Sequence, residues 1–438
     1  MQSDYVIVGG GAGGLELACK LGRKLGARRV TLVDSRLYHI WKPSLHEVAA
    51  GTLDIHQEGL SYQMLAHDNG FTFVYGAMTG LDSVVQRITV GAVTDAAGGE
   101  VLPERPLDYQ SVVIAVGSTS NYFGVPGARE NTISLNATED AERFRLTLLR
   151  LMARVEQEMY EGGQKEGDLH DGIDIVIIGG GATGVELAAE LREASGVYTS
   201  YGFHQLDAKR DVRITLLEGA ERILAPLPER VSGAALRLLN KRAINVVTGC
   251  RVTSIAPDHI EDAKGNRYRS NLCVWAAGIR APEFLAGLGL PVNRSGQIEV
   301  DAQLAVKGVP NVYALGDCAA CIDADGHAVP PRAQSAHQQA DHLLKRFVAE
   351  AAGKPAPTGL YRYRDYGSLV SIGHATTVGS LMGSLKGLSW FVEGFVARTM
   401  YKSLHLMHHQ AVLGSMRTGV LAVARYLIRR STPLVKLH

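Results

Sequence analysis

Short apolar runs that end in glycine-rich turns recur along this chain. The first run, Tyr5–Val8, leads through such a turn into a segment of helical periodicity, Leu15–Lys24, and then into a second run, Val30–Val33. Apolar runs of this length between glycine turns are typical of buried strands, and a period of about 3.6 residues is typical of a helix. The pattern therefore predicts a β-α-β unit whose second strand ends at Asp34.

The same order begins again near residue 174. The runs Asp174–Ile178 and Arg213–Leu217 flank a periodic segment, Val185–Glu193, and the second run ends at Glu218. Residues around Val197–Arg210 lengthen this second unit. We expect them to form a surface excursion, because loops absorb insertions at a small cost in free energy.

Each half carries a further apolar run that closes on small residues. Val112–Val116 precedes Gly117 about 106 residues after the first glycine turn, and Cys273–Ala277 precedes Gly278 about 97 residues after the second. These matching positions indicate a duplicated architecture.

A third apolar run and a helix follow the second half. The run Asn311–Leu315 ends in a Gly-Asp turn at Asp317, and Pro330-Pro331 open a periodic segment that extends to about Ala349. Proline in the first turn is a helix start signal. The stretch Tyr366–Leu385 has four Gly and four Ser and no charged residue, which predicts strands and turns.

The last 53 residues differ from the rest of the chain in charge. From Lys386 to His438 there are eight Lys or Arg and one acid, Glu393. Apolar residues recur there at helical spacing in two stretches: Phe391, Phe395, Val396, Met400, Leu404, Met407 and Ala411, then Val420, Leu421, Val423, Ala424, Leu427 and Ile428.

The composition is that of a globular protein with several domains. The 438 residues are 46% hydrophobic and 20% charged, so two or three domains with sizeable cores are expected. The net charge of +1 argues against a nucleic-acid partner. Five cysteines, odd in number and mostly isolated, are typical of a cytosolic protein. We expect neither a signal peptide nor a membrane-spanning helix.

Both glycine turns have the composition of a dinucleotide-binding loop. The first glycine permits a tight bend, the second lets the backbone approach a pyrophosphate, and the third lets helix and strand pack closely. Backbone N–H groups and the positive end of the helix dipole then face the phosphates. We expect these contacts from Gly9, Gly11, Ala12, Gly13 and Gly14 in the first half and from Gly179, Gly181 and Gly184 in the second.

An acid closes the second strand of each unit. Its carboxylate accepts hydrogen bonds from a ribose 2′-hydroxyl and disfavours a 2′-phosphate, so Glu218 predicts NADH rather than NADPH. Asp34 stands at the equivalent place, 20 residues after Gly14. A chain that binds two dinucleotides is therefore expected to transfer electrons from one to the other.

The later Gly-Asp turn indicates which half holds a flavin. Asp317 suits a hydroxyl-rich ribityl chain, and the N-terminus of a helix that starts near Arg332 would stabilise the negative charge of a reduced flavin ring, with Ala333 beside it. We therefore assign the flavin to the first half, with Gly117 bordering it, and the nicotinamide to the second half, with Gly278 bordering it.

The predicted fold is α/β, with two Rossmann-like dinucleotide-binding domains and a C-terminal membrane-associating helical segment. Residues 1–125 and 296–385 form the flavin-binding domain, residues 126–295 form the NADH-binding domain, and residues 386–438 form an amphipathic anchor.

These motifs resemble the type II NADH dehydrogenases, the single-subunit NADH:quinone oxidoreductases of respiratory membranes. The resemblance rests on the paired glycine turns, on Tyr313–Asp317 and on the Ala-Gln-x-Ala-x-Gln pattern at Ala333–Gln338. The segment Trp41–Ala49 and the ending at His438 look like the proteobacterial branch. The match covers essentially the whole chain.

The resemblance implies an activity and several residue roles. It implies hydride transfer from NADH to FAD, then transfer of two electrons to ubiquinone or menaquinone without proton pumping. It also implies that Gln334 and Gln338 lie beside the flavin where quinone binds, that Glu186 lies near the contact between nicotinamide and flavin, and that Lys42 borders the flavin.

Quinone reduction consumes protons, so a proton relay should reach the site. Glu47, His46, His337 and Glu186 are candidates, although a solvated helix face explains His337 better. Gln334 and Gln338 are spaced i, i+4 and share one helical face. A merely polar helix face explains them equally well without the resemblance.

The Cys-x-x-Cys pair at Cys318 and Cys321 has three interpretations. A redox disulfide would make the protein a disulfide reductase. A thiolate metal site would need another ligand, such as His327. We favour plain packing beneath the flavin and predict no metal site.

The basic, amphipathic C-terminal segment is typical of helices that lie in a bilayer interface. A dimer interface or a helix that caps the core would explain it too. We therefore expect a peripheral enzyme on the cytoplasmic face of the bacterial inner membrane, in contact with anionic lipid and present as a homodimer. Two other functions stay open, a soluble reductase of ferredoxin or disulfides and a non-catalytic NADH sensor.

Overall fold

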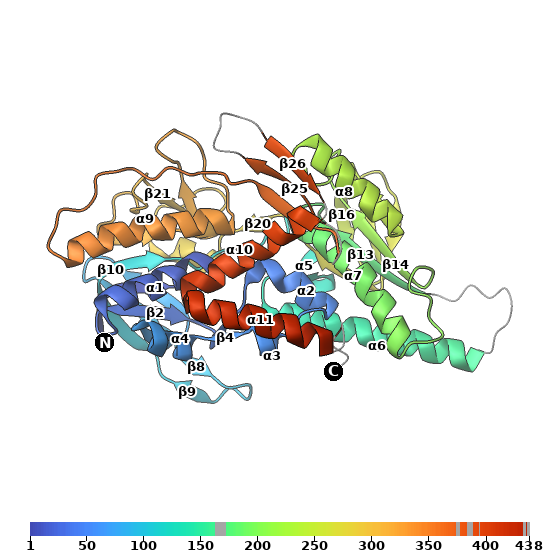
Figure 1. The fold of residues 1–438 in the computed structure, drawn as a ribbon, viewed down its shortest axis with the longest axis horizontal. Helices are drawn as coiled ribbons and strands as arrows, with labels where there is room; N and C mark the ends of the chain where they lie inside the picture. Colours follow the sequence, from blue (N-terminus) through green and yellow to red (C-terminus); the bar gives the residue numbers. More distant parts are fainter. Residues whose placement is uncertain (163–171, 374–376, 383–388, 394, 432–434, 436–438) are drawn as a thin grey trace.

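The computed structural model describes the whole chain except residues 163–171, 374–376, 383–388, 394, 432–434 and 436–438. Two large sheets dominate it, a mixed one in the first half and a parallel one in the second (Figure 1). The first has the order β5-β2-β1-β10-β7-β6, with β22 also paired to β10. Its strands are β1 (Gln2–Val8), β2 (Val30–Asp34), β5 (Thr72–Tyr75), β6 (Met78–Asp82), β7 (Arg87–Val90), β10 (Arg105–Ile114) and β22 (Val312–Ala314).

The second sheet has the order β12-β19-β13-β14-β15 and is parallel throughout. Its strands are β12 (Ile133–Ser134), β13 (Ile173–Ile178), β14 (Val212–Leu217), β15 (Ile244–Val247) and β19 (Leu272–Trp275). Beside it is an antiparallel sheet of β16 (Val252–Ile255), β17 (His259–Asp262) and β18 (Arg267–Arg269).

Four strand pairs complete the two halves. They are β3 (Tyr38–His39) with β4 (Leu60–Ser61), β8 (Val93–Thr94) with β9 (Glu100–Leu102), β11 (Thr119–Ser120) with β20 (Ile279–Arg280), and β21 (Ile298–Val300) with β23 (Ala319–Cys321).

The register confirms the predicted duplication. Val8 at the end of β1 lies opposite Ile114 of β10, and Ile178 at the end of β13 lies opposite Trp275 of β19. Each glycine turn therefore leaves its sheet beside the small-residue turn of the neighbouring strand. The return of β22 to the first sheet, parallel to β10, brings residues after 296 back to the first half.

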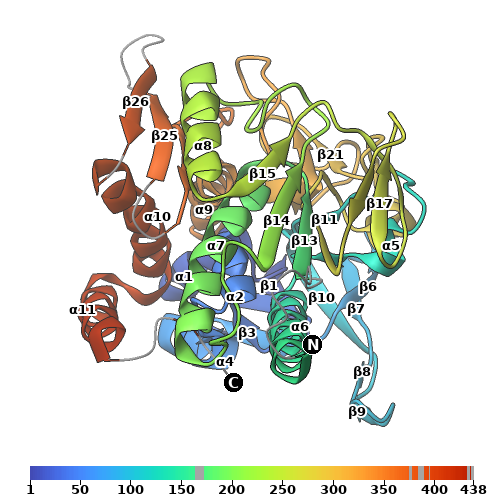
Figure 2. The same cartoon turned by 90° about the vertical axis from the view of Figure 1, so that its right-hand side faces the viewer.

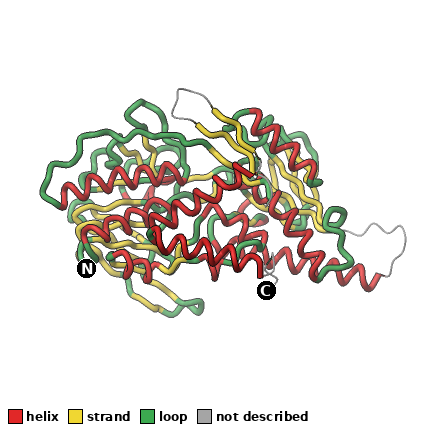
Figure 3. The backbone as a smooth tube through the Cα atoms, in the orientation of Figure 1, coloured by secondary structure: helices red, strands yellow, loops and turns green. Residues whose placement is uncertain are grey.

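Helices cover the strands on the side that faces the viewer in Figure 3. The helices of the two halves are α1 (Ala12–Leu25), α2 (Leu45–Ala50), α3 (Ile55–Glu58), α4 (Tyr62–Asn69), α5 (Ala128–Asn131), α6 (Thr138–Gly162), α7 (Ala182–Tyr201), α8 (Glu229–Lys241) and α9 (Ala333–Ala351). Short 3₁₀ turns lie at Lys42–Ser44, Glu283–Leu288 and Gly316–Cys318. Both β-α-β units therefore form where the apolar periodicity predicts them.

The C-terminal part adds a small sheet and two helices. The sheet joins β24 (Ser368–Ser371), β25 (Thr377–Met382) and β26 (Ser389–Glu393). Its strands lie on both sides of the domain boundary expected between 385 and 386. Helix α10 (Phe395–Leu413) packs against α1 and this sheet, and α11 (Ser415–Ser431) packs against α10. In Figure 2 these two helices form an outer layer, with α1 and then the first sheet inside it.

Three local expectations were wrong. The surface excursion at Val197–Arg210 begins as helix, because α7 runs to Tyr201; the Tyr198 side chain is fully buried and donates a hydrogen bond to the Ala50 carbonyl at 2.9 Å. Phe391 is not helical, because β26 pairs with β25 there. The two prolines precede α9 rather than open it, and Arg332 occupies the N-cap position without a side-chain capping bond.

Candidate functional site

The two glycine turns have nearly the same geometry. Gly9 has φ +104°, and a Cβ there would lie 2.5 Å from the Ala115 carbonyl oxygen. Gly179 has φ +115°, and its Cβ would lie 2.7 Å from the Ala276 oxygen. No side chain fits at either position, so each turn can only be built with glycine.

The space in front of both helices is open. A Cβ on Gly11 would meet only one atom, at 4.0 Å, and a Cβ on Gly181 would meet nothing within 4 Å. These glycines are the N-cap residues of α1 and α7, whose first N–H groups have no partner within the helix. Each turn therefore leaves a cradle of N–H donors with room for a pyrophosphate.

The strand-end acids bind back to the glycine turns in the same way. Asp34 accepts hydrogen bonds from the N–H groups of Gly10 at 2.6 Å and Arg36 at 2.8 Å. Glu218 accepts them from Gly180 at 2.5 Å and Ala220 at 2.7 Å. Burial raises the pKa of Asp34, and its two backbone donors oppose that shift. Both carboxylates are fixed beside their loops, as ribose binding requires.

A second turn of the first half gathers polar groups. Asp317 accepts a hydrogen bond from the Ser118 hydroxyl at 2.8 Å, and Lys42 donates to the Ser118 carbonyl at 2.8 Å. Loss of surrounding water lowers the pKa of Lys42, and the Asp317 carboxylate opposes that shift. The structure thus brings together Lys42, Asp317 and the turn that begins at Gly117, three parts of the chain that we assigned to the flavin.

Gln339 is a positioning residue that sequence reasoning missed. Its side chain is almost fully buried, and its amide oxygen accepts the Gly316 N–H at 2.7 Å. Helix α9 therefore holds the Gly-Asp turn in place. The only signal for this role was the position of Gln339, off the face that Gln334 and Gln338 share.

Gln334 and Gln338 do lie on one face of α9, where both are half-buried. Gln338 makes a two-point contact with Arg364, donating to its carbonyl at 2.8 Å and accepting its N–H at 2.9 Å. Gln334 donates to Asp365 and to the Gly367 carbonyl, each at 3.3 Å. The two amides therefore fix the segment 364–367 against the start of α9.

The carboxylate candidates lie on two neighbouring helices. Glu186 on α7 is buried, accepts the Ser371 N–H at 3.0 Å and lies 3.8 Å from His46 on α2. Glu47 is on α2, and Glu190, one turn beyond Glu186, accepts the hydroxyl hydrogen of Thr52 at 2.5 Å. Glu190 was not predicted. Glu186 and His46 thus come together where α2 packs on α7, and Glu47 lies on α2 next to His46 in the sequence.

His337 does not belong to that group, and a solvated helix face does not describe it. It contacts Glu16 of α1 through Nδ1 and stacks on Trp41, with ring centroids 5.8 Å apart. Its side chain is 25% exposed.

Both members of the cysteine pair lie inside the protein. All five cysteines are free and buried, and burial raises the pKa of both Cys318 and Cys321 to about 12. The Cys318 thiol faces the carbonyls of Leu315 at 3.3 Å and Ile114 at 3.5 Å. His327, by contrast, has a ring that is 80% exposed. Buried thiols held protonated are poor ligands and poor nucleophiles.

The outer helix α11 has two different faces. Four side chains at helical spacing are between 59% and 83% exposed: Met416, Val420, Val423 and Leu427. Arg417 and Arg425 instead point back to the body of the protein and pair with Asp68 and Glu58. These are the only cations of the basic segment whose side chains the structure describes, so both are engaged within the protein. Within the described residues, no helix has the length and apolarity needed to cross a bilayer.

Comparison with known proteins assigns the family. A family profile described as pyridine nucleotide-disulphide oxidoreductase matches residues 3–340. The type II NADH:quinone oxidoreductase of Haemophilus influenzae is 37% identical over 448 residues, covering 100% of both chains. The chain belongs to the type II NADH:quinone oxidoreductases.

Two further similarities extend over most of this type II NADH:quinone oxidoreductase. The type II NADH:quinone oxidoreductase of Mycobacterium tuberculosis is 27% identical over 413 residues, covering 92% of this chain and 83% of that one. The structure of NDH2 from Plasmodium falciparum in complex with NADH superposes with a TM-score of 0.80 at 19% identity, covering 100% of both chains. The resemblance to the proteobacterial branch is thereby confirmed, and so is the two-dinucleotide fold.

Proposed function

We propose that this chain oxidises NADH and reduces a membrane quinone, ubiquinone or menaquinone, through a bound FAD and without pumping protons. The observation that carries the proposal is the duplicated cradle, in which two loops of nearly the same geometry each end beside a fixed carboxylate. The relative from Haemophilus influenzae, similar over its full length, bears the name of this activity. A bound flavin accepts two electrons as hydride and can release them to a quinone.

We propose that residues 1–125 and 296–385 bind FAD and that residues 126–295 bind NADH. The Asp317 turn and the N-terminus of α9 support the first assignment, because both belong to the first half through β22. The fixed carboxylate of Glu218 supports NADH in the second half, because a 2′-phosphate would face a negative charge there.

The remaining residues have roles in moving protons and in binding quinone. Glu186 can hold a proton between the Ser371 N–H and His46, with Glu47 on the same helix as His46. The amides of Gln334 and Gln338 can donate to quinone carbonyls if they exchange their contacts with the segment 364–367 for contacts with the substrate.

Steady oxidation of NADH tests this function. Turnover should depend on added ubiquinone or menaquinone. A non-catalytic sensor would stop after one reduction of its flavin, and a soluble reductase would require ferredoxin or a disulfide instead of quinone.

Changing the acid of the second cradle should alter cofactor preference. In Glu218→Ala/Ala220→Arg the carboxylate is gone and a cation stands on the residue whose N–H group Glu218 binds. We expect the ratio of kcat/KM for NADH over NADPH to fall by about 100-fold, the equivalent of about 2.7 kcal/mol. Arg267→Ala, an exposed change in the separate β18 strand, is the control. An unchanged ratio would contradict the role of Glu218.

We further propose that the enzyme binds peripherally to the cytoplasmic face of the bacterial inner membrane, where NADH is produced. The stripe on α11 (Met416, Val420, Val423 and Leu427) is continuous and exposed, which suits the interfacial zone of a bilayer. Because Arg417 and Arg425 are paired with acids, apolar insertion rather than charge should contribute most of the binding by this helix. A homodimer stays a prediction.

Removing the stripe should release the protein from membranes. Each Val or Leu side chain transferred from water stabilises binding by about 1.5 kcal/mol or more, so Val420→Ser/Val423→Ser/Leu427→Ser should weaken liposome partitioning by at least about 100-fold. The control, Val84→Ser/Val101→Ser, changes two valines that are 91% and 57% exposed elsewhere. Co-sedimentation with vesicles measures the effect, and flavin content should not change. A variant that still sediments but turns monomeric would show that a second copy covers the stripe instead.

A further inference from the structure

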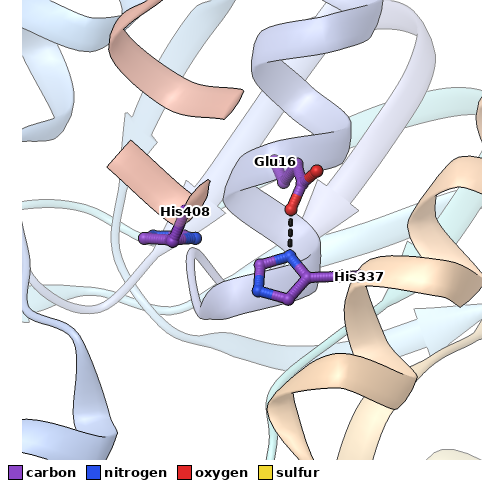
Figure 4. Close-up of side chains that lie close together, drawn as sticks. All are labelled: Glu16, His337 and His408. Carbon is purple, nitrogen blue, oxygen red and sulfur yellow. Dashed lines mark hydrogen bonds and ion pairs between the residues drawn. The ribbon is translucent and has the colours of Figure 1, made fainter. Parts of the chain in front are cut away.

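A cluster of two histidines and one glutamate lies outside the machinery proposed above. Glu16 comes from α1, His337 from α9 and His408 from α10 (Figure 4). Each offers one ligand atom, and the three atoms lie within 4.8 Å of one another. Glu16 and His408 are buried, and His337 is the one member that solvent reaches. Three segments distant in sequence thus converge on a small polar site.

The hydrogen bonds fix which nitrogen of His408 is free. His39 lies with Nδ1 2.9 Å from the Gly10 carbonyl, so Nδ1 carries the hydrogen and Nε2 is an acceptor. His408 Nε2 lies 2.9 Å from that Nε2 and must therefore donate to it. The remaining nitrogen, His408 Nδ1, is an unprotonated lone pair, and it is buried with no hydrogen-bond partner.

An unpartnered buried lone pair is costly, and a bound cation would satisfy it. With one nitrogen donating to His39 and the other carrying no hydrogen, the His408 ring is neutral, the form that binds metal ions. The chain from His408 through His39 to the Gly10 carbonyl is also the outer-shell arrangement that orients metal-binding imidazoles.

We propose that Glu16, His337 and His408 bind one Zn²⁺ ion or a similar divalent transition metal. Two imidazoles and one carboxylate are a ligand set that Zn²⁺ favours. Lys20 contacts Glu16 through Oε1 at 2.5 Å and leaves Oε2 toward His337. Since α10 supplies one ligand and α1 and α9 supply the others, a bound ion would fasten the C-terminal segment to the first half.

The protein has a second group of two histidines and one glutamate, and it differs from the first in one respect. Glu58, His405 and His409 also bring three ligand atoms within 4.8 Å of one another. That position already holds a cation, because the guanidinium of Arg425 contacts Glu58 and lies 3.4 Å from both His405 and His409. We therefore place the ion in the first triad and use the second as the matched control.

Metal binding by the holoenzyme tests the proposal. Protein stripped with EDTA is dialysed against micromolar Zn²⁺ at neutral pH, and zinc per chain is measured by mass spectrometry. All variants carry Cys318→Ser and Cys321→Ser, so that the cysteine pair does not contribute. We expect one Zn²⁺ per chain in this background and in His405→Gln. His408→Gln and His337→Gln should bind at least about 100-fold more weakly, since loss of a ligand exceeds the effect of an outer-shell change.

X-ray absorption and a variant of His39 test the ligand set independently. X-ray absorption at the zinc edge should show nitrogen and oxygen ligands with imidazole scattering. If His408→Gln does not fold, His39→Gln leaves all three ligands in place and removes the imidazole that links His408 to the Gly10 carbonyl. It should weaken binding by about 10–100-fold. The proposal is overturned by zinc binding that is equal in His405→Gln and His408→Gln, or by the absence of stoichiometric binding in the background protein. Neither result bears on NADH oxidation.

Discussion

Gly184→Ala is expected to weaken NADH binding severely, and so to slow reduction of the flavin at low NADH concentrations, while the flavin stays bound. A Cβ at this position would lie 1.9 Å from the Gly179 carbonyl oxygen, a backbone atom of the same loop. The loop must open to admit the methyl group, and the N–H groups of α7 then leave the positions that a pyrophosphate needs. We expect the Kd for NADH to rise at least about 100-fold and the free energy of unfolding to fall by about 3 kcal/mol.

The same helix offers a matched control. Gly196→Ala also adds a methyl group within α7, but nothing lies within 4 Å of its Cβ. Alanine is the better helix former, so this variant should bind NADH normally and be more stable by about 0.5–1 kcal/mol. Stopped-flow reduction at several NADH concentrations measures the affinity, and thermal unfolding measures the stability. Normal flavin reduction in Gly184→Ala would contradict the placement of NADH in the second half.

Gln338→Glu is expected to slow quinone reduction by about 10–100-fold and to leave reduction of the flavin by NADH within about 2-fold of the wild type. A carboxylate can still accept the Arg364 N–H, but it cannot donate to the Arg364 carbonyl, which would face a negative charge. An unmet hydrogen bond of this kind costs about 1–3 kcal/mol. The segment 364–367 should therefore separate from α9 where we propose that quinone binds.

Rapid mixing separates the two half-reactions. NADH is mixed with oxidised enzyme in the first experiment, and quinone is mixed with enzyme already reduced by NADH in the second. Lys345→Gln, an exposed change on the same helix, controls for a general effect on α9. Equal losses in both half-reactions would contradict a role for Gln338 in quinone binding alone.

Local sequence signals predicted the parts of this molecule that are set by neighbouring residues. The glycine turns, the strand-end acids Asp34 and Glu218 and the return of Asp317 to the first half follow from spacing and from backbone sterics. Dinucleotide loops are built from contiguous residues, so a sequence is sufficient to find them. The same reasoning found that Gln334 and Gln338 share a face of α9.

Contacts between distant segments were beyond the reach of the sequence. Helix α7 extends to Tyr201 because the Tyr198 side chain is buried against α2. Phe391 lies in a strand because β26 pairs with β25. The expectation of a solvated His337 was wrong because Glu16, 321 residues away, pairs with it. The basic C-terminal residues were assigned to lipid from their charge, yet Arg417 and Arg425 pair with Asp68 and Glu58. Helical periodicity predicts which residues share one face of a helix. It does not predict whether that face contacts lipid, solvent or another part of the protein.

The central claim is that one chain brings NADH and a flavin together and passes the electrons to a quinone. Its most direct test is anaerobic sequential-mixing absorption spectroscopy of the purified enzyme. The account predicts that NADH bleaches the flavin band within the turnover time and that ubiquinone or menaquinone, added next, restores it. A protein that is colourless and takes up no flavin, or a reduced flavin that quinone does not reoxidise, would contradict it.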